Sequence, residues 1–354
     1  MEKMKIAIVV MYLSGGGSER FAVSLANGIV KNSHSVTLLT AEKTSDEYAL
    51  DNRIYRKEIL CRRRLIRDAW RIRSVLINER MDVVIAIGIY PNLCCGLANY
   101  NLGTKVILCE RNDPLHDHLS WKSKLLRRFL FPNGDGYVFQ TNEAKEFYGE
   151  EIQRRSIVIP NPILSNLPKR QNTGKKEFVA IGRLCKQKNY RVMLEAFAKV
   201  CEKDKEYILR IFGRGKLEKQ LRTQAIELGI DDRVVFEGYC QDVHDRIVNS
   251  DIYIISSDFE GISNALMEAM AMGFPVISTD WPSGGAKVLI ENGVNGILVP
   301  VCDCIELARS MLYLIENTET KERMGRAAST VKEKYSIDRI VNTWDSFINI
   351  VVAG

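Results

Sequence analysis

Two glutamates eight positions apart form the most specific chemical pattern in the sequence. Glu260 stands in Ser-Ser-Asp-Phe-Glu-Gly-Ile-Ser-Asn, and Glu268 follows within an otherwise apolar stretch that favours a helix. We expect Ser263 or Asn264 to cap this helix, with Glu268 about one turn into it. A carboxylate facing the core needs a polar partner or ligand, whereas one on the solvent face needs neither. The N–H groups at the helix start could also hold an anion.

A pair of cations in one loop forms the second group of candidates. Arg183 and Lys188 lie in Gly-Arg-Leu-Cys-Lys-Gln-Lys-Asn, after the apolar run 178–181 and before a helix expected over 189–201. Arginine offers a planar fork of donors and lysine a compact point charge, a combination that suits a diphosphate. The alternative is that both side chains are solvated loop charges.

Three consecutive glycines near the amino end could also hold an anion. Residues 14–20 read Ser-Gly-Gly-Gly-Ser-Glu-Arg, after a strand-like run and before a helix expected over 18–30. Glycines let a ligand approach the backbone, and the first helical turn offers unpaired N–H groups. The segment is neither a dinucleotide fingerprint, because position 20 is Arg, nor a Walker motif, because Gly-Lys-Ser/Thr is absent. The alternative is a tight turn without a ligand.

Other polar residues are weaker candidates. Glu110 and Arg111 follow an apolar run that ends at Cys109, so they could lie at the carboxyl end of a strand. The histidines show no metal-ligand spacing, and the Gly-x-Ser-x-Gly turn of many hydrolases is absent. We therefore predict no metal site and no cofactor. The histidines are His34, His116, His118 and His244.

Basic residues concentrate in two amphipathic stretches of the first half. Residues 56–80 contain nine Lys or Arg against three acids, which equals the net charge of +6 for the whole chain. The stretch 121–130 interleaves cations with Trp and Phe, as expected for a helix at a membrane surface. Solvated basic faces are the alternative, and a nucleic-acid partner is not expected because the rest of the chain is neutral. The candidates for lipid phosphate and an anionic membrane surface are Arg63, Arg64, Arg67, Trp121, Lys124 and Arg128.

These candidates require a scaffold of alternating strands and helices. Short apolar runs alternate with longer amphipathic stretches along the chain, which predicts parallel sheets covered by helices on both faces. The alternation breaks in a polar stretch containing Pro and Gly near residues 160–176 and then restarts. We therefore expect an α/β protein with two Rossmann-like doubly wound domains and a ligand cleft between them. The expected boundaries are 1–164, 165–335 and a final helix at 336–354.

Length and composition agree with a soluble two-domain protein. The chain has 354 residues, 46% hydrophobic and 27% charged. Its nine cysteines form no Cys-x-x-Cys pair and no secretory leader is recognisable, which favours reduced thiols in the cytosol. The charge-free segment 83–104 is interpreted as a strand over 83–89, a turn at 90–92 and a short helix, because it contains Pro, Asn and Gly.

Taken in order, six segments make the chain resemble the retaining GT-B glycosyltransferases of family 4. The resemblance extends nearly end to end, and the ordered set is more specific than any one segment. It implies two Rossmann-like domains facing across a cleft, with the final helix crossing back to the first domain. The segments are Ser-Gly-Gly-Gly-Ser-Glu-Arg at 14–20, Gly-Arg-Leu-x3-Lys-Asn at 182–189, Gly-x-Gly at 213–215, Val-Phe-x-Gly at 235–238, Phe-Glu-Gly-x-Ser-Asn-x3-Glu at 259–268 and Gly-x-Asn-Gly-x-Leu-Val at 293–299.

The resemblance also implies a role for each candidate residue. Arg183 and Lys188 would bind the donor diphosphate in catalysis, and Glu260 would contact the donor sugar. Many family members carry His where this chain has Arg111, so the resemblance does not extend to a histidine that activates the acceptor. The remaining donor-binding residues would be Gly16, Gly182, Phe236 beside the base, Gly261, Ile262, Ser263, Asn264 and Glu268 on the ribose; Gly15, Gly17, Glu110 and Arg111 would lie toward the acceptor.

The function that follows is sugar transfer at a membrane surface. The resemblance implies a metal-independent enzyme that moves a hexose or N-acetylhexosamine from a nucleotide sugar, with UDP favoured, to a polyprenyl-diphosphate-linked acceptor. It also implies capsule or related polysaccharide biosynthesis on the inner face of the cell membrane. The alternatives are a nucleotide-sugar epimerase of the same double-Rossmann fold and a non-catalytic nucleotide-sugar sensor.

Overall fold

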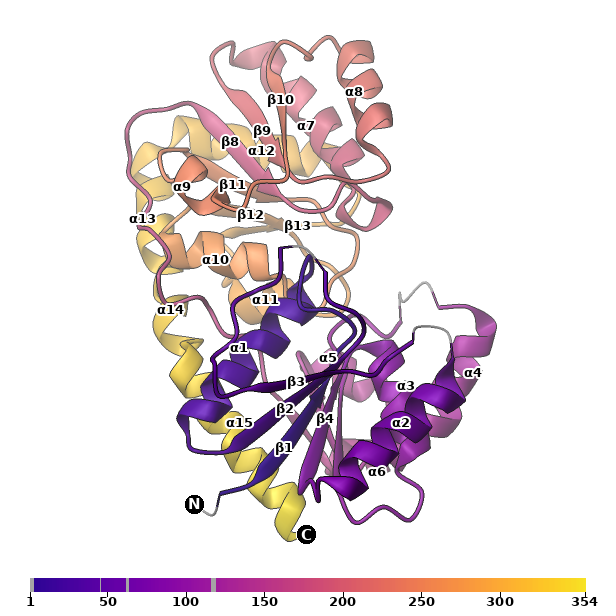
Figure 1. Ribbon diagram of the computed structural model, residues 1–354. Coiled ribbons are helices and arrows are strands. Elements are labelled where there is room, and N and C mark those ends of the chain that lie inside the picture. The colour runs from indigo at the N-terminus through magenta and orange to yellow at the C-terminus, as the bar shows by residue number, and fades with distance from the viewer. Residues whose placement is uncertain (1–2, 45, 62–63, 116–118) are drawn as a thin grey trace. The chain divides into compact units, whose positions relative to one another are not determined.

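Buried apolar runs form the strands of two separate parallel sheets. The computed structural model describes residues 3–44, 46–61, 64–115 and 119–354. It divides into a first unit of residues 1–162 and 335–354 and a second unit of residues 163–334 (Figure 1). Strands such as Val83–Ile87 are buried along their whole length, as expected for a parallel sheet with helices on both faces.

The first unit contains a seven-stranded parallel sheet in the order β3-β2-β1-β4-β5-β6-β7. The order reverses between β1 and β4, as in the doubly wound fold expected from the sequence. The strands are β1 (Lys5–Val9), β2 (Ser35–Thr40), β3 (Tyr55–Glu58), β4 (Val83–Ile87), β5 (Lys105–Cys109), β6 (Gly136–Phe139) and β7 (Ser156–Val158).

Helices cover both faces of the first sheet. Buried residues of α2 and α3 join the core on one face, whereas α1 and α15 pack together on the other, as Figure 1 shows. The final helix therefore belongs to the first unit, as predicted. The helices are α1 (Gly17–Lys31), α2 (Leu65–Asn78), α3 (Ile89–Ala98), α4 (Trp121–Leu130), α5 (Asn142–Glu146), α6 (Glu150–Arg154) and α15 (Ile337–Ala353).

The contact between α1 and α15 is close and specific. A Cβ atom on Gly28 would collide with Val341, so glycine permits the approach of the two helices. The rings of Phe21 and Trp344 lie 5.8 Å apart. Asp345 is buried and accepts a hydrogen bond from the Asn32 side chain. Apolar packing and a buried polar contact thus join the last helix to the first.

The second unit repeats the same topology with six parallel strands in the order β10-β9-β8-β11-β12-β13. Its reversal lies between β8 and β11, which are hydrogen-bonded neighbours. The loops that follow these two strands diverge at their carboxyl ends, the usual ligand position in such sheets. The strands are β8 (Glu177–Ile181), β9 (Ile208–Phe212), β10 (Val234–Gly238), β11 (Ile252–Ile255), β12 (Val276–Thr279) and β13 (Ile297–Val299).

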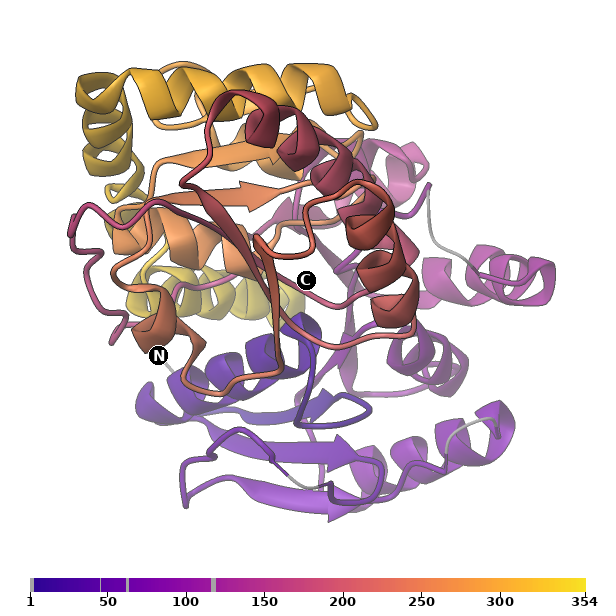
Figure 2. The same ribbon diagram turned by 90° about the horizontal axis from the view of Figure 1, so that it is seen from above.

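Helices of the second unit also divide between two faces. Buried residues of α7, α8 and α12 form one core with the sheet, and α12 lies beside α7 (Figure 2). Helix α10 contacts β12, α13 and α14. The helices are α7 (Tyr190–Lys203), α8 (Glu218–Glu227), α9 (Val243–Ile247), α10 (Asn264–Met272), α11 (Gly285–Leu289), α12 (Cys304–Glu316), α13 (Thr318–Ala328) and α14 (Val331–Lys334).

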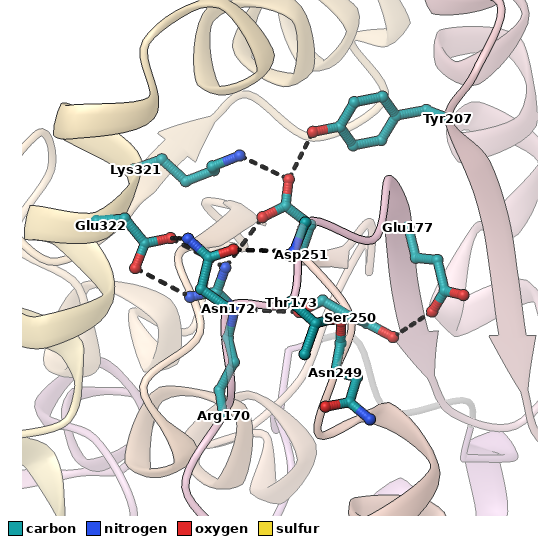
Figure 3. A network of polar contacts seen from close by, with 11 residues as sticks. Arg170, Asn172, Thr173, Glu177, Tyr207, Asn249, Ser250, Asp251, Lys321 and Glu322 are labelled. Atoms are coloured by element: carbon teal, nitrogen blue, oxygen red, sulfur yellow. Dashed lines mark hydrogen bonds and ion pairs between the residues drawn. The ribbon is translucent and has the colours of Figure 1, made fainter.

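A buried ionic network lies just before β11 in the second unit (Figure 3). Asp251 accepts hydrogen bonds from Arg170 at 2.9 Å, Lys321 at 2.6 Å and the Tyr207 hydroxyl at 2.5 Å. Arg170 also donates to Glu322 at 3.1 Å. Each buried charge thus has an opposite partner, and the network joins residue 170, β11 and α13.

The expected turn at residues 90–92 is wrong. Strand β4 ends at Ile87, Gly88 adopts a φ of +95°, and α3 begins at Ile89. Pro91 lies in the first helical turn, where its missing N–H costs no intrahelical hydrogen bond. The reversal therefore occurs at a glycine before the proline. Among the described residues, every helix is too short or too polar to cross a membrane.

Candidate functional site

The loops after β8 and β11 bring two predicted site residues into direct contact. Lys188 Nζ lies 2.6 Å from Glu260 Oε1, although 72 positions separate them in the chain. The Ser257 hydroxyl donates to the same carboxylate oxygen at 3.1 Å. The side chains of Lys188 and Glu260 are 12% and 13% exposed. They therefore form a largely enclosed ion pair that a small ligand could still reach.

Backbone and amide contacts hold these two loops together. Gln187 donates from its side chain to the Phe259 carbonyl at 2.9 Å, and its own carbonyl accepts the Asp258 N–H at 2.9 Å. Asn189 adopts a φ of +43° and donates to Asp258 Oδ1 at 2.6 Å. The sequence carries no local signal of these contacts of Gln187 and Asp258, because their partners lie about 70 positions away. Only the position of Asn189 before a helix signals an unusual backbone.

Glycines allow the loop after β8 to lie close to its neighbours. A Cβ atom on Gly182 would stand 2.9 Å from Lys188 Cε and 3.0 Å from the Tyr190 hydroxyl. A Cβ atom on Gly213 would collide with the Gly182 carbonyl. Arg183 is exposed and donates to Gln187 Oε1 at 3.3 Å. Arg183 and Lys188 therefore leave one loop with different environments, one solvated and one ion-paired.

The start of α10 is rigid and capped. Ser263 is the N-cap, as predicted, and its hydroxyl accepts the Leu266 N–H. The Gly261 carbonyl accepts the indole N–H of the buried Trp281 at 3.1 Å. Ile262 is buried as well, and Asn264 is the first residue of the helix. The predicted anion-binding segment 261–264 is thus fixed by contacts within its own domain.

Glu268 is buried in α10 and has a histidine partner. Its Oε2 lies 3.0 Å from His244 Nε2, and the two side chains are 8% and 18% exposed. The solvent-face alternative for Glu268 is therefore wrong. The sequence analysis did not identify His244 as a site residue, because a lone histidine without metal spacing gives no signal of this contact.

The charges of both glutamates affect one buried tyrosine, Tyr253. The Tyr253 hydroxyl on β11 is fully buried. Burial is the main cause that raises its pKa, and the negative charges of Glu268 and then of Glu260 raise it further. The two pairs, Lys188 with Glu260 and His244 with Glu268, both lie in segments that follow strands of the second sheet at their carboxyl ends. We refer to these four residues as the polar cluster.

Phe236 lies on β10 and is partly buried against the core of its domain. The guanidinium of Arg222 covers its ring at 4.6 Å from the centroid. Val234 shares its side of the strand and is buried, whereas Val235 is exposed. The expected contact of Phe236 with a nucleotide base stays a prediction.

The glycine segment of the first domain forms the entry to α1. Gly15 adopts a φ of +84° with open space around its Cα, and Gly16 is the extended N-cap. A Cβ atom on Gly16 would collide with the Glu19 carboxylate. Gly17 is the first residue of the helix. The segment has the backbone conformation that the glycines predict, and its ligand stays a prediction.

Glu110 and Arg111 are buried within the first domain. Glu110 accepts a hydrogen bond from the Tyr148 hydroxyl at 3.2 Å. Arg111 stacks on the Phe21 ring at 3.7 Å and donates to the Asn161 side chain and to the Ile159 carbonyl. Burial lowers the pKa of Arg111 to about 10. Several contacts therefore fix both side chains inside the domain, and an acceptor contact stays a prediction.

The basic stretches expose apolar side chains together with their cations. Trp121 on α4 is 71% exposed and Trp70 on α2 is 69% exposed. Arg127 differs from the other cations of α4, because it is buried and donates to the Pro114 carbonyl. Arg63 lies outside the described residues. The remaining predicted cations, Arg64, Arg67, Lys124 and Arg128, are exposed.

No group of three or more His, Cys, Asp or Glu could hold a metal ion in the part of the chain that the structure describes. His34 is buried and accepts the Met4 N–H, and His116 and His118 lie outside the described residues.

Comparison with known protein families agrees with this geometry. Residues 166–331 match the model of "Glycosyl transferases group 1", and residues 15–164 match that of "Glycosyltransferase Family 4". Together the two models cover nearly the whole of both domains. The chain belongs to the GT-B glycosyltransferases.

Relatives of this glycosyltransferase cover its whole length. It is 26% identical to an uncharacterized glycosyltransferase of Haemophilus influenzae, with 97% of this chain and 99% of the relative covered. It is 27% identical to GalNAc-alpha-(1->4)-GalNAc-alpha-(1->3)-diNAcBac-PP-undecaprenol alpha-1,4-N-acetyl-D-galactosaminyltransferase of Campylobacter jejuni, with 96% and 97% covered.

Solved structures share the fold of this glycosyltransferase. HepE of Anabaena in complex with UDP and glucose superposes with a TM-score of 0.82 at 16% identity, covering 98% of this chain and 99% of that one. TarM superposes with a TM-score of 0.83 at 13% identity, covering 98% and 99%. At these identities the likeness shows the common GT-B fold alone.

Proposed function

We propose that this glycosyltransferase is a retaining enzyme that moves a hexose or N-acetylhexosamine from a UDP-sugar to a polyprenyl-diphosphate-linked sugar. The observation that carries this proposal is the polar cluster at the carboxyl end of the second sheet, where Lys188 and Glu260 meet beside Gly182. The UDP complex of HepE supports the choice of nucleotide. The Campylobacter relative, named for a PP-undecaprenol substrate, supports the class of acceptor.

Arg183 and Lys188 supply positive charge where the reaction generates negative charge. Cleavage of the bond between the anomeric carbon and the diphosphate leaves that charge on the nucleotide, so fixed cations stabilise the transition state more than the ground state. Lys188 is paired with Glu260 in this structure, and a bound diphosphate would share that cation. The N–H groups at the start of α10, residues 261–264, add donors of fixed direction. These groups would support catalysis without a divalent metal.

Retention of configuration follows if attack and departure use the same face of the sugar. The acceptor hydroxyl forms the new bond to the anomeric carbon as the bond to the diphosphate breaks, and a phosphate oxygen takes the hydroxyl proton. Glu260 would orient the donor sugar, Glu268 would accept hydrogen bonds from the ribose hydroxyls, and Phe236 would contact the base. Gly16 and Gly182 would border the donor.

The acceptor would be held by the first domain. Gly15 and Gly17 lie at the amino end of α1, where a phosphate could approach the backbone. Glu110 and Arg111 follow β5 and are both buried, so they would contribute to the acceptor site from inside the domain. Their role in acceptor binding is part of the proposal.

The basic helices of the first domain would place the enzyme on the inner face of the cell membrane. Trp121 and Phe129 of α4 are exposed beside Lys124 and Arg128, and Trp70 of α2 is exposed near Arg67. Exposed aromatic rings next to cations suit an anionic lipid surface. A peripheral position there would bring the enzyme to lipid-linked precursors of capsule or other surface polysaccharides.

A donor panel with a lipid-linked acceptor tests the transfer reaction. Purified protein is incubated with UDP-, GDP-, ADP- and CMP-sugars and an undecaprenyl-diphosphate-linked sugar, with and without EDTA. We expect transfer from a UDP-sugar, an unchanged rate with EDTA, and a product whose anomeric configuration by NMR equals that of the donor. Failure of every donor would overturn the transferase proposal, and an inverted anomer would overturn retention. An epimer formed from the donor alone would support the isomerase instead.

Vesicle co-sedimentation tests the membrane position. We expect binding to phosphatidylglycerol-rich vesicles that weakens with salt, and little binding to phosphatidylcholine vesicles. Charge reversal of Lys124 and Arg128 to Glu should remove it, whereas the same reversal at the exposed Lys199 and Lys203 of α7 should not. Equal binding by both double variants would contradict the assignment to α4.

A further inference from the structure

We propose that His244 is a positioning residue that orients Glu268 toward the nucleotide ribose and thereby sets donor affinity. The inference rests on the proposed role of Glu268, and it adds a residue outside the motifs of the sequence analysis. Its basis is the contact of 3.0 Å between His244 Nε2 and Glu268 Oε2.

The two residues reach each other from separate parts of the second sheet. His244 lies on α9, which follows the edge strand β10, whereas Glu268 lies on α10, which follows β11. Strands β9 and β8 separate β10 from β11 in the sheet. Two contacts of Arg246 help to hold α9, the helix that carries His244. The Arg246 side chain pairs with Asp242 at 3.0 Å, and the Arg246 carbonyl accepts a hydrogen bond from Arg210.

The surroundings of Glu268 explain why its orientation needs support. The carboxylate is buried, and its charge adds to the effect of burial in raising the pKa of the buried Tyr253 hydroxyl. A buried carboxylate is costly unless donors hold it, and His244 is one such donor. A hydrogen bond from His244 to Oε2 fixes the plane of the carboxylate, so that Oε1 keeps one direction. A fixed acceptor binds a ribose hydroxyl with less loss of side-chain freedom.

The side chain of His244 has the exposure expected of a group at the rim of a ligand site. It is 18% exposed, and its Nε2 contacts Glu268 Oε2. A histidine that served only to fill the core would be expected to lie deeper. His244 therefore stands between Glu268 and solvent, where it can hold the carboxylate and limit the access of water.

The test compares nucleotide binding and kinetics in five variants of the protein. The nucleoside diphosphate that binds the wild type most tightly among UDP, GDP, ADP and CDP is chosen by calorimetry, and its 3′-deoxyribose analogue is measured beside it. We expect His244→Ala to weaken binding of the diphosphate about tenfold and to weaken binding of the analogue much less. His244→Gln, which retains an N–H donor, should recover most of the loss. Asp245→Ala, an exposed neighbour on α9, should match the wild type.

Kinetics and a double variant separate positioning from a merely structural role. His244→Ala should raise the donor KM with little change in kcat or in the acceptor KM. Adding His244→Ala to Glu268→Ala should have no further effect, because the histidine acts through the glutamate. Equal loss of both nucleotides, additive losses in the double variant, or unchanged binding in His244→Ala would overturn the inference. Failure of the wild type to bind any of the four nucleotides would instead overturn the proposed function.

Discussion

The two ends of strand β11 carry charged residues with opposite properties. At the amino end, Asp251 is buried among Arg170, Lys321 and Tyr207, and each charge has a partner within the protein (Figure 3). At the carboxyl end, the ion pair of Lys188 and Glu260 keeps partial access to solvent. The same strand thus joins a closed network to a site that a ligand can enter.

The difference in burial shows which charged residues contribute to stability and which can bind a ligand. A closed network is costly to break, because removing one member leaves the others charged in a poor solvent. An accessible ion pair costs less to break. A negatively charged ligand can then take the place of Glu260 as the partner of Lys188. We therefore expect substitutions at the amino end to affect unfolding and those at the carboxyl end to affect turnover.

The largest effect is expected at the closed network. Asp251→Ala should lower the free energy of unfolding by about 3–5 kcal/mol, because Arg170 and Lys321 lose their shared buried carboxylate. Urea denaturation and hydrogen exchange of the β11 amides both measure this loss. Asp242→Ala removes an exposed ion pair with Arg246 in the same domain and should change stability little. Similar values for the two variants would remove the distinction between closed and exposed charges.

Substitution at the open end should reduce turnover instead. Lys188→Ala and Arg183→Ala should each lower kcat by about 100-fold or more, because charge on the departing diphosphate loses its counter-charge. Lys186→Ala, an exposed neighbour in the same loop, provides the control. Initial rates under donor saturation measure the effect, and circular dichroism checks the fold. Nearly normal turnover in both Arg183→Ala and Lys188→Ala would contradict their assignment to the leaving group.

Arg111 tests whether the contrast extends to the first domain. Arg111→Ala should lower the free energy of unfolding by about 2 kcal/mol, because its stacking on Phe21 and its hydrogen bond to Asn161 are lost. Donor binding should be little changed, since the side chains proposed to contact the donor, such as Lys188, Glu260 and Glu268, lie in the second domain. Hydrogen exchange of the β5 amides and calorimetry with UDP measure the two quantities. Weaker UDP binding with unchanged stability would reverse this assignment.

The smallest effect is expected for the ion pair of Glu47 and Arg56, as a dependence of stability on pH. Burial raises the pKa of Glu47, but hydrogen bonds from Arg56 and Thr44 outweigh it, so the pKa lies below its ordinary value of 4.5. The stabilisation is therefore present above that value and is lost as pH falls through the lowered pKa. Glu47→Gln should cost about 1 kcal/mol or less at pH 7, and the difference should disappear under strongly acidic conditions. A difference that is constant with pH would exclude this linkage.

The sequence predicts much of the fold because its buried strands are continuous apolar runs between amphipathic helices. It does not predict β3, whose residues Tyr-Arg-Lys-Glu are mostly polar on the edge of a sheet. The turn at 90–92 was misplaced because Pro91 signals a break in a loop but is also tolerated in a first helical turn. Local patterns thus identify central strands better than edges and boundaries.

The candidate site was predictable in residue type but not in pairing. Gly182, Lys188 and Glu260 stand in recognisable local patterns, whereas the contact between Lys188 and Glu260 depends on the order of the strands. The contact between His244 and Glu268 depends on two helices that follow non-adjacent strands. Burial of Arg111 was equally hidden, because its partners Phe21 and Asn161 lie far away in sequence. Tertiary contacts of this kind require the fold.

The close contact of α15 with α1 has a consequence for biosynthesis. The first domain is made of two segments, and the whole of the second domain is translated between them. Until α15 emerges from the ribosome, Phe21 lacks its contact with Trp344 and Gly28 lacks its contact with Val341. The second domain can therefore complete its fold first, while the first domain, although begun earlier, is completed only when its last helix has been made.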